Sequence, residues 1–255
     1  MTERTINFTD IEVKFIDKMG SDARVRNVAY ASFDRWLPED KFEEHGLIEY
    51  LATGLPKSER DNWEKQAKAH THWTTMAHCQ LSIMCKAPIF LARQLVKHQV
   101  GLVWNETSRR YVKSDVELYL PKEFHKAPEN AKQGASKEIH SSFVWTGKAI
   151  NTPTAKQLVK NVSEESVQVY YELLDAGVAP EEARMTLPLN SMTNWVWTGS
   201  LVAFNRVYQQ RSDSHAQLAA QEFAHKLGAI LYEHFPVSME ALNYGNNPYK
   251  IDVEN

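Results

Sequence analysis

The sequence has little cysteine and no long apolar run. Its 255 residues include only two cysteines, which are too few for a disulfide framework and favour a reducing compartment. No apolar stretch approaches the roughly 20 residues that span a bilayer, and the first residues lack the apolar core of a signal peptide. We therefore expect a cytoplasmic protein with no membrane partner.

Charge of neither sign is in large excess. The chain carries 29 Lys and Arg against 32 Asp and Glu, a formal net charge of −3. This balance argues against a protein that coats nucleic acid through bulk electrostatics, but it leaves room for a local cationic pocket that binds a few phosphates. Apolar residues make up 43% and charged residues 24% of the chain, which excludes a disordered or fibrous protein.

Several motifs of known chemistry are missing. The sequence contains no Gly-x-Ser-x-Gly, no Gly-x-x-x-x-Gly-Lys and no Gly-x-Gly-x-x-Gly. Cys79 and Cys85 fall in a segment that we predict as an apolar helix, where burial raises the pKa of a thiol and lowers its reactivity. His70, His72 and His78 lie close together, but no Cys or carboxylate completes a familiar ligand spacing, so we predict no metal site.

The order of apolar and polar residues predicts mainly helix. Alternation over residues 11–19 predicts a strand that closes at Gly20, after which Asp22 is expected to cap a helix. Another helix is predicted from Ser163, as its cap, to a stop at Gly177. Further helices are predicted after Thr74, after Pro88, and over residues 135–150, 180–184, 190–210 and 213–234. Because no strand–helix–strand unit recurs, we expect one α+β domain over residues 1–255.

Polar side chains gather in two segments where packing does not require them. The first runs from Arg93 to Gln99 and continues from Asn105 to Tyr111, and it supplies cations, amides, a carboxylate and hydroxyls. Arginine binds phosphate in a bidentate manner and lysine acts as a compact charge, so this segment is a candidate phosphate or nucleotide site. A solvated helix face followed by a charged turn is the alternative interpretation.

The second segment runs from Asn205 to His215. Its Arg211 is predicted to stand immediately before a helix N-terminus, where a cation is unfavourable unless an anion joins it. Such a conflict is typical of a functional site. The alternative is that Arg211 simply pairs with Asp213 or another nearby acid.

These segments, read together, make the chain resemble the flavin-dependent thymidylate synthases. The family signature Arg-His-Arg followed by Asn-Glu-x-Ser-x-Arg-Tyr corresponds here to Lys97-His98-Gln99 and residues 105–111. Residues 86–94, 187–190 and 211–217 are also very similar to the family. Two arginines of the triplet are replaced by Lys97 and Gln99, and the interval before Ser108 is one residue longer. Ser200, Val202 and Arg206 stand where the family often has Asn, Arg and Asn.

The resemblance implies a fold and an activity. The fold would be α+β, a helix-rich single domain with a small central mixed or antiparallel sheet. The activity would be reductive methylation of dUMP to dTMP, with methylenetetrahydrofolate as the one-carbon donor and FAD, reduced by NADPH, as the hydride donor. No cysteine nucleophile would take part. The family also implies a homotetramer with sites between subunits, small-molecule partners and no nucleic-acid partner.

The resemblance further assigns residues to the two ligands. The residues expected to bind dUMP are Gln94, Glu106, Thr107, Ser108, Arg109, Arg110, Arg184 and Arg211. Those expected to bind FAD are His72, Thr74, Lys97, His98, Gln99, Glu106, Ser200 and Arg206. Arg211 is the expected catalytic residue, because a permanently charged guanidinium at the uracil edge would stabilise negative charge as N3 ionises.

Two other functions remain open at this point. The altered triplet and the changed positions 200, 202 and 206 are compatible with a non-catalytic nucleotide- or flavin-binding descendant. A flavoprotein that oxidises NADPH without methylating dUMP is the other alternative. Flavin absorbance and dTMP formation distinguish the three.

Overall fold

The centre of the molecule is a four-stranded antiparallel sheet. The computed structural model describes residues 4–40, 42–43, 45–112, 115–129, 135–144 and 153–244. The strand order is β2-β3-β6-β4, formed by β2 (Glu12–Met19), β3 (Gln80–Pro88), β6 (Met192–Ser200) and β4 (Leu102–Glu106). This confirms the strand predicted over residues 11–19 and the helix-rich α+β fold with a small antiparallel sheet.

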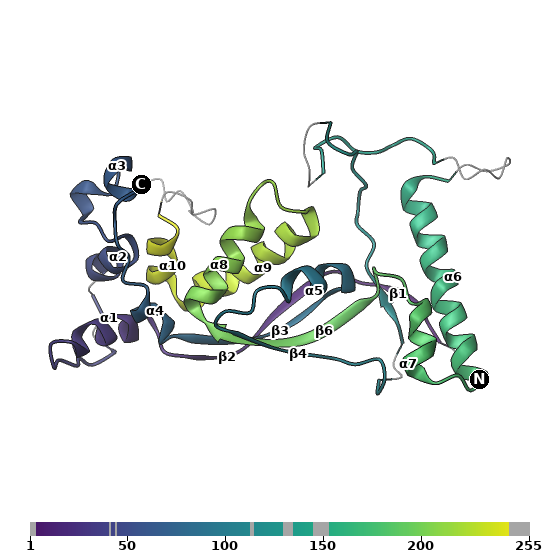
Figure 1. The fold of residues 1–255 in the computed structure, drawn as a ribbon, viewed down its shortest axis with the longest axis horizontal. Helices are drawn as coiled ribbons and strands as arrows, with labels where there is room; N and C mark the ends of the chain where they lie inside the picture. Colours follow the sequence, from purple (N-terminus) through teal and green to yellow (C-terminus); the bar gives the residue numbers. More distant parts are fainter. Residues whose placement is uncertain are drawn as a thin grey trace.

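Helices cover one face of this sheet. Above it lie α5 (Ile89–Leu95), α8 (Leu201–Ser212) and α9 (Leu218–His234) (Figure 1). Successive side chains of a strand point to opposite faces, and the residues at alternate positions of β3 and β6 are buried in the same core as α8 and α9. They are Leu81, Ile83, Cys85, Ala87, Trp195 and Trp197. None of the described helices is both long and apolar enough to cross a bilayer.

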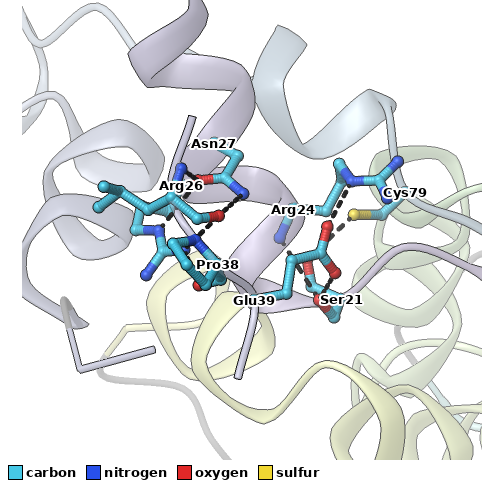
Figure 2. A network of polar contacts seen from close by, with 8 residues as sticks. Ser21, Arg24, Arg26, Asn27, Pro38, Glu39 and Cys79 are labelled. Carbon is cyan, nitrogen blue, oxygen red and sulfur yellow. Dashed lines mark hydrogen bonds and ion pairs between the residues drawn. The ribbon is translucent and has the colours of Figure 1, made fainter. Parts of the chain in front are cut away.

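A helical lobe lies at one end of the sheet. It contains α1 (Asp22–Ala31), α2 (His45–Thr53), η1 (Lys57–Glu59), α3 (Trp63–Gln66), α4 (Thr74–Ala77) and α10 (Pro236–Leu242) (Figure 1). Figure 2 shows how side chains of α1 hold the segment that follows it. The fully buried Arg26 donates to the carbonyl of Pro38 at 2.9 Å, and Arg24 donates to Glu39 at 2.8 Å.

The other end of the molecule has its own small core. Helices α6 (Ala155–Asp175) and α7 (Pro180–Ala183), with the turn η2 (Arg184–Thr186), pack beside a parallel pair of β1 (Asn7–Phe8) and β5 (Glu117–Leu118). The buried apolar residues there are Val116, Leu118, Val167, Tyr170, Tyr171 and Ala183. The Tyr171 hydroxyl accepts a hydrogen bond from the Val116 amide at 2.7 Å. This core holds η2 in place and therefore sets the position from which the Arg184 side chain extends. That residues 1–255 form a single domain remains a prediction.

Two predicted helices are strands in the structure. The helix predicted after Thr74 ends at Ala77, and the following residues form β3, so Cys85 lies on a strand. The first half of the helix predicted over residues 190–210 is β6. The physical reason is that β3 pairs along its length with both β2 and β6. Buried and more exposed residues alternate along both strands, and the sequence interpretation took their apolar residues for one face of a helix.

Two other helix boundaries also differ from the prediction. Helix α6 begins at Ala155 with Thr154 as its cap, while Ser163 lies buried in mid-helix and donates to Asn190 at 3.2 Å. The stop at Gly177, where φ is +85°, is confirmed. Residues 135–144 form no helix but contain isolated bridges, one of them between His125 and Ile139. The rest of that predicted helix, residues 145–150, lies outside the described residues.

Asp22 does cap a helix, but not the one predicted. Ser21 caps α1, and its hydroxyl accepts from the Arg24 amide at 3.4 Å. The buried Asp22 carboxylate instead accepts from the amides of Val237 at 3.0 Å and Ser238 at 2.9 Å, at the start of α10. The side chain therefore caps a helix more than two hundred residues further along the chain. Pro236, just past the end of α9, begins this additional helix.

Candidate active site

A cavity of about 430 Å³ opens where β4 ends and β6 begins. We call it the β4 cavity. It is lined by Ile89, Glu106, Thr107, Ser108, Arg109, Val112, Asp115, Glu117, Arg184, Leu187, Ser191, Met192, Thr193 and Asn194. Five of the eight residues predicted to bind dUMP lie here: Glu106, Thr107, Ser108, Arg109 and Arg184. The structure thus brings Arg184 together with residues 106–109, which are far from it in sequence.

The pairing of β4 with β6 places the first of these residues. In the ladder Trp104 is opposite Trp197 and Glu106 is opposite Trp195, and the ring of Trp104 stacks on that of Trp195 at 4.2 Å. Beyond the strand, the Thr107 amide still donates to the Asn194 carbonyl at 2.8 Å. The polar segment therefore leaves the sheet in a fixed direction, with Glu106 at the strand end.

The polar atoms of this segment are engaged in defined contacts. Glu106 accepts from the Thr193 hydroxyl at 2.7 Å and from the Trp104 indole nitrogen at 3.3 Å. Ser108 Oγ accepts from the amide of Arg110 at 3.3 Å and from its Nε at 3.1 Å. Arg110 itself is exposed and does not line the cavity, so its expected contact with dUMP would need a rotation of its side chain.

The β4 cavity contains both cations and acids. Arg109 donates to the Asp115 carbonyl at 3.1 Å, and Arg184 donates through Nε to the Glu181 carbonyl at 3.3 Å. The carboxylate of Glu117 pairs with Lys86 at 2.6 Å. Two guanidinium groups and the hydroxyl of Ser108 suit a phosphate, because guanidinium donors match phosphate oxygens.

A second cavity, of about 450 Å³, lies at the end of α8. We call it the α8 cavity. Its lining residues are Gln94, Gln209, Gln210, Arg211, Asp213, His215, Ala216 and Gln217. Gln94 and Arg211 were both predicted to bind dUMP, and the Oε1 atom of Gln94 is buried here with no hydrogen-bond partner among the described residues. A buried acceptor without a donor is costly to maintain, and it is the kind of atom that a ligand N–H would satisfy.

The position of Arg211 differs from the prediction. It lies in the last turn of α8, not before a helix N-terminus, and a cation is favourable at a helix C-terminus. Asp213 pairs with His215 at 3.0 Å and not, as the alternative interpretation had it, with Arg211. Arg211 donates through Nε to Nε2 of His98 at 3.1 Å. Burial, and secondarily the charge of Arg211, lower the pKa of His98, while burial lowers the pKa of Arg211.

The predicted flavin-binding residues lie on several different elements. Lys97 and Gln99 are exposed after α5, and the amide of Ser200 donates to the carbonyl of Gly101 at 3.1 Å. Gly101 has φ +76°, and a methyl group on it would lie 3.1 Å from Cβ of Ala203. This close approach ties the altered triplet to the start of α8, where the Ser200 hydroxyl accepts from the Ala203 amide.

The remaining predicted flavin residues lie near α4. The guanidinium of Arg206, on α8, is 5.8 Å from the ring of Trp73, which directly precedes Thr74. The ring of His72 stacks on Tyr50 at 5.8 Å. Arg206, Thr74 and His72 are all exposed. They therefore offer their polar groups outward, while Val202, the other changed position, is buried and unsuited to a polar contact.

Neither thiol is suited to nucleophilic attack. Cys79 and Cys85 are both free and buried. Burial raises the pKa of Cys79 to about 12 and raises that of Cys85 well above its ordinary value. The predicted burial and raised pKa of both thiols are confirmed, although Cys85 lies on a strand and Cys79 directly before it. Within the described ranges, no group of three or more His, Cys, Asp or Glu residues is arranged to hold a metal ion.

The sequence interpretation missed several residues that line the β4 cavity or support it. Thr193 and Asn194 were missed because their segment was interpreted as helix. Trp104 and Asp115 were not among the predicted site residues. Alternation from Thr193 to Gly199 was the available signal, since a strand there would have placed Thr193 and Trp195 on the same face.

Helices lie over an antiparallel sheet, and two cavities carry arginine, amide and hydroxyl groups, which are groups that can bind a nucleotide. Comparisons with known proteins give the class. Residues 14–237 match the family described as "Thymidylate synthase complementing protein". The chain belongs to this family, and its predicted resemblance to the flavin-dependent thymidylate synthases is confirmed.

Individual relatives agree with this assignment. The chain is 31% identical over 229 residues to the flavin-dependent thymidylate synthase of Thermosipho africanus, covering 90% of this chain and 89% of the relative. It is 31% identical over 246 residues to the enzyme of the same name from Gluconobacter oxydans, covering 92% and 72%. A UMP/dUMP methylase from Streptomyces cacaoi, solved with 5-Br dUMP, has a similar fold, with a TM-score of 0.67, 21% identity and coverage of 92% and 95%.

Proposed function

We propose that the protein catalyses the reductive methylation of dUMP to dTMP. The main observation behind this proposal is the β4 cavity, which Arg184 and residues 106–109 of the family signature line together. In this proposal the phosphate of dUMP binds Arg184 and Ser108, because these groups donate hydrogen bonds to oxygen anions. The relatives named flavin-dependent thymidylate synthase support the same reaction.

FAD would bind near the start of α8. The lysine of the altered triplet, Lys97, offers a point charge for the pyrophosphate, and Arg206 offers a second cation on the exposed face of α8. The Gly101 carbonyl, four residues after Lys97, accepts from the amide of Ser200, which caps the helix that carries Arg206. These donors fit an anionic dinucleotide, although Val202 removes one polar contact that the family often has. FAD supplies hydride chemistry when it is reduced, with NADPH as the expected reductant and methylenetetrahydrofolate as the expected one-carbon donor.

Arg211 would activate the pyrimidine. Its Nε is occupied by His98, so its two Nη groups are the donors left for a ligand in the α8 cavity. A guanidinium at the uracil edge stabilises negative charge as N3 ionises, which makes C5 more nucleophilic without a covalent bond to the enzyme. The buried Oε1 of Gln94, which lines the same cavity, would accept a hydrogen bond from the ligand.

The complete site would form between subunits. Arg184 and Arg211 line two different cavities of one chain, while the proposed reaction needs both at one nucleotide. The chain also exposes large apolar side chains, among them Val100, Val103, Tyr111, Met185, Leu189 and Leu218. Burial of such residues between copies of a chain stabilises an oligomer. A homotetramer that shares its sites between subunits, acting in the cytoplasm, is therefore part of the proposal.

One assay tests the proposed function. The purified protein is examined for bound flavin by its visible absorbance and is then supplied with dUMP, NADPH and methylenetetrahydrofolate. Formation of dTMP that depends on all three supports the proposal. NADPH oxidation without dTMP would instead indicate a flavin oxidoreductase, and absence of both flavin and turnover would indicate a non-catalytic binding protein.

A further inference from the structure

We propose that Thr193 and Trp104 are positioning residues that hold the Glu106 carboxylate as the acceptor for a sugar hydroxyl in the β4 cavity. The inference rests on the proposed function, because it takes the nucleotide to be dUMP. Two side chains donate hydrogen bonds to the Glu106 carboxylate, one to each oxygen. The Thr193 hydroxyl donates to Oε1 at 2.7 Å, and the Trp104 indole nitrogen donates to Oε2 at 3.3 Å.

The two donors restrict a side chain that is otherwise loosely held. Glu106 is exposed at the end of β4, and the terminal torsion of a glutamate has a broad, shallow preference. One donor on each oxygen fixes the plane of the carboxylate. An ionised carboxylate has about four acceptor positions and no donor, so two positions remain available for a ligand after these contacts are made.

The donors themselves belong to rigid parts of the fold. Thr193 is 8% exposed and lies in β6 opposite Ala87 of β3. The Trp104 ring stacks on Trp195 at 4.2 Å and meets Trp197 edge-on at 5.3 Å. Groups carried by packed strands keep their positions better than groups on loops. The carboxylate is therefore held in place before a ligand enters.

The charge of Glu106 selects what it binds. A carboxylate repels a phosphate, so in the β4 cavity the phosphate belongs beside Arg184 and Ser108, and the Glu106 end takes a neutral donor. A deoxynucleotide offers its 3′-hydroxyl close to the phosphate. The Glu106 carboxylate accepts from that hydroxyl, and a substrate lacking it leaves the carboxylate without its ligand partner.

The test compares dUMP with 2′,3′-dideoxyuridine monophosphate, which lacks the 3′-hydroxyl. Hydrogen bonds to charged groups predict that the native protein binds dUMP about tenfold or more tightly than the analogue. In Thr193→Val, which removes the hydroxyl at similar size, this preference should fall to about threefold or less, because a freed carboxylate binds the hydroxyl less well. Thr193→Ser is the matched control and should restore the preference. A native-like preference in Thr193→Val would overturn the proposal.

A second measurement needs no nucleotide. The indole N–H resonance of Trp104 is assigned by its loss in Trp104→Phe, and it should shift upfield in Glu106→Gln as the charged acceptor disappears. An unchanged resonance would show that the contact does not exist in solution, which contradicts the inference. If the native protein binds neither dUMP nor the analogue, the proposed function fails, and the resonance still decides whether Trp104 holds Glu106. Melting temperatures show that each variant is folded.

Discussion

Arg211 donates a hydrogen bond through Nε to Nε2 of His98, a residue 113 positions earlier in the chain, at 3.1 Å. An imidazole nitrogen accepts a hydrogen bond only when it carries no proton. The contact therefore requires His98 to be neutral at Nε2. Burial and the neighbouring guanidinium both favour that neutral form, which lowers the pKa of His98. One side of the α8 cavity thus depends on the protonation of a single ring.

This contact predicts an acid limb in the pH profile. As the pH falls through the lowered pKa of His98, below its ordinary value of 6.5, the imidazole gains a proton, loses its acceptor and repels Arg211. We expect kcat/KM to fall there. In the same range the unfolded chain binds more protons than the folded one, so the free energy of unfolding decreases as the pH falls.

The matched variants isolate this titration. His98→Gln keeps an acceptor but cannot titrate, so its acid limb should shift or disappear. His78→Gln, at an exposed histidine outside both cavities, should keep the native profile. An acid limb that persists unchanged in His98→Gln would assign it to another group.

Sharing of sites between subunits predicts complementation. Arg184→Ala and Arg211→Ala should each reduce dTMP formation by about 100-fold or more, as the loss of a preorganised cation does in other enzymes. When both variants are assembled into mixed oligomers, about one quarter of the sites would combine a native Arg184 from one subunit with a native Arg211 from another. Activity should return to a comparable extent. Mixed oligomers that stay inactive would mean that each chain supplies both arginines to one site.

Removal of the Cys79 thiol should leave turnover unchanged. Cys79→Ala should keep native turnover, because a thiol whose pKa is raised to about 12 contributes no thiolate at neutral pH. The same change should lower the free energy of unfolding by about 1–2 kcal/mol, since Cys79 is fully buried and its thiol donates to the Ser21 carbonyl at 3.4 Å. Turnover and urea unfolding measure the two effects separately. A stable but inactive Cys79→Ala would restore a thiol mechanism.

The cap of α10 predicts a stability effect at a distance from both cavities. Asp22→Ala leaves the amides of Val237 and Ser238 without their acceptor, so we expect a loss of about 2 kcal/mol in the free energy of unfolding. Asp40→Ala, at an exposed aspartate of the same lobe, is the control and should change it by less than about 0.5 kcal/mol. Equal effects of the two changes would contradict the capping role.

The sequence was most informative where structure is determined locally. The alternation before Gly20, the proline that opens α7 and the glycine that ends α6 all act over a few residues, and the elements predicted from them are present. Strands β3 and β6 were missed because the strands that pair with them are distant in sequence. The same limit applies to Asp22, whose helix-capping partner lies at the other end of the chain.

The candidate site was predicted unevenly for a related physical reason. The cations and the signature residues were identified from their types and order, and five of the residues assigned to dUMP line one cavity. The pairing of Arg211 with His98 is a tertiary contact that no local pattern indicates. Thr193 is an ordinary threonine in the sequence, and only the register of β6 against β4 brings it to Glu106.

The order of the strands constrains how the protein is made. Among the described strands, β4 pairs in the sheet only with β6, yet it leaves the ribosome long before Met192–Ser200 has been synthesised. Until then Glu106 lacks both its strand partner and the hydroxyl of Thr193, so the β4 cavity has not formed. Pairings between distant segments also slow folding, because the intervening chain must first be closed into a loop. Premature termination anywhere before β6 would therefore yield a product without a site, however complete the signature it carries.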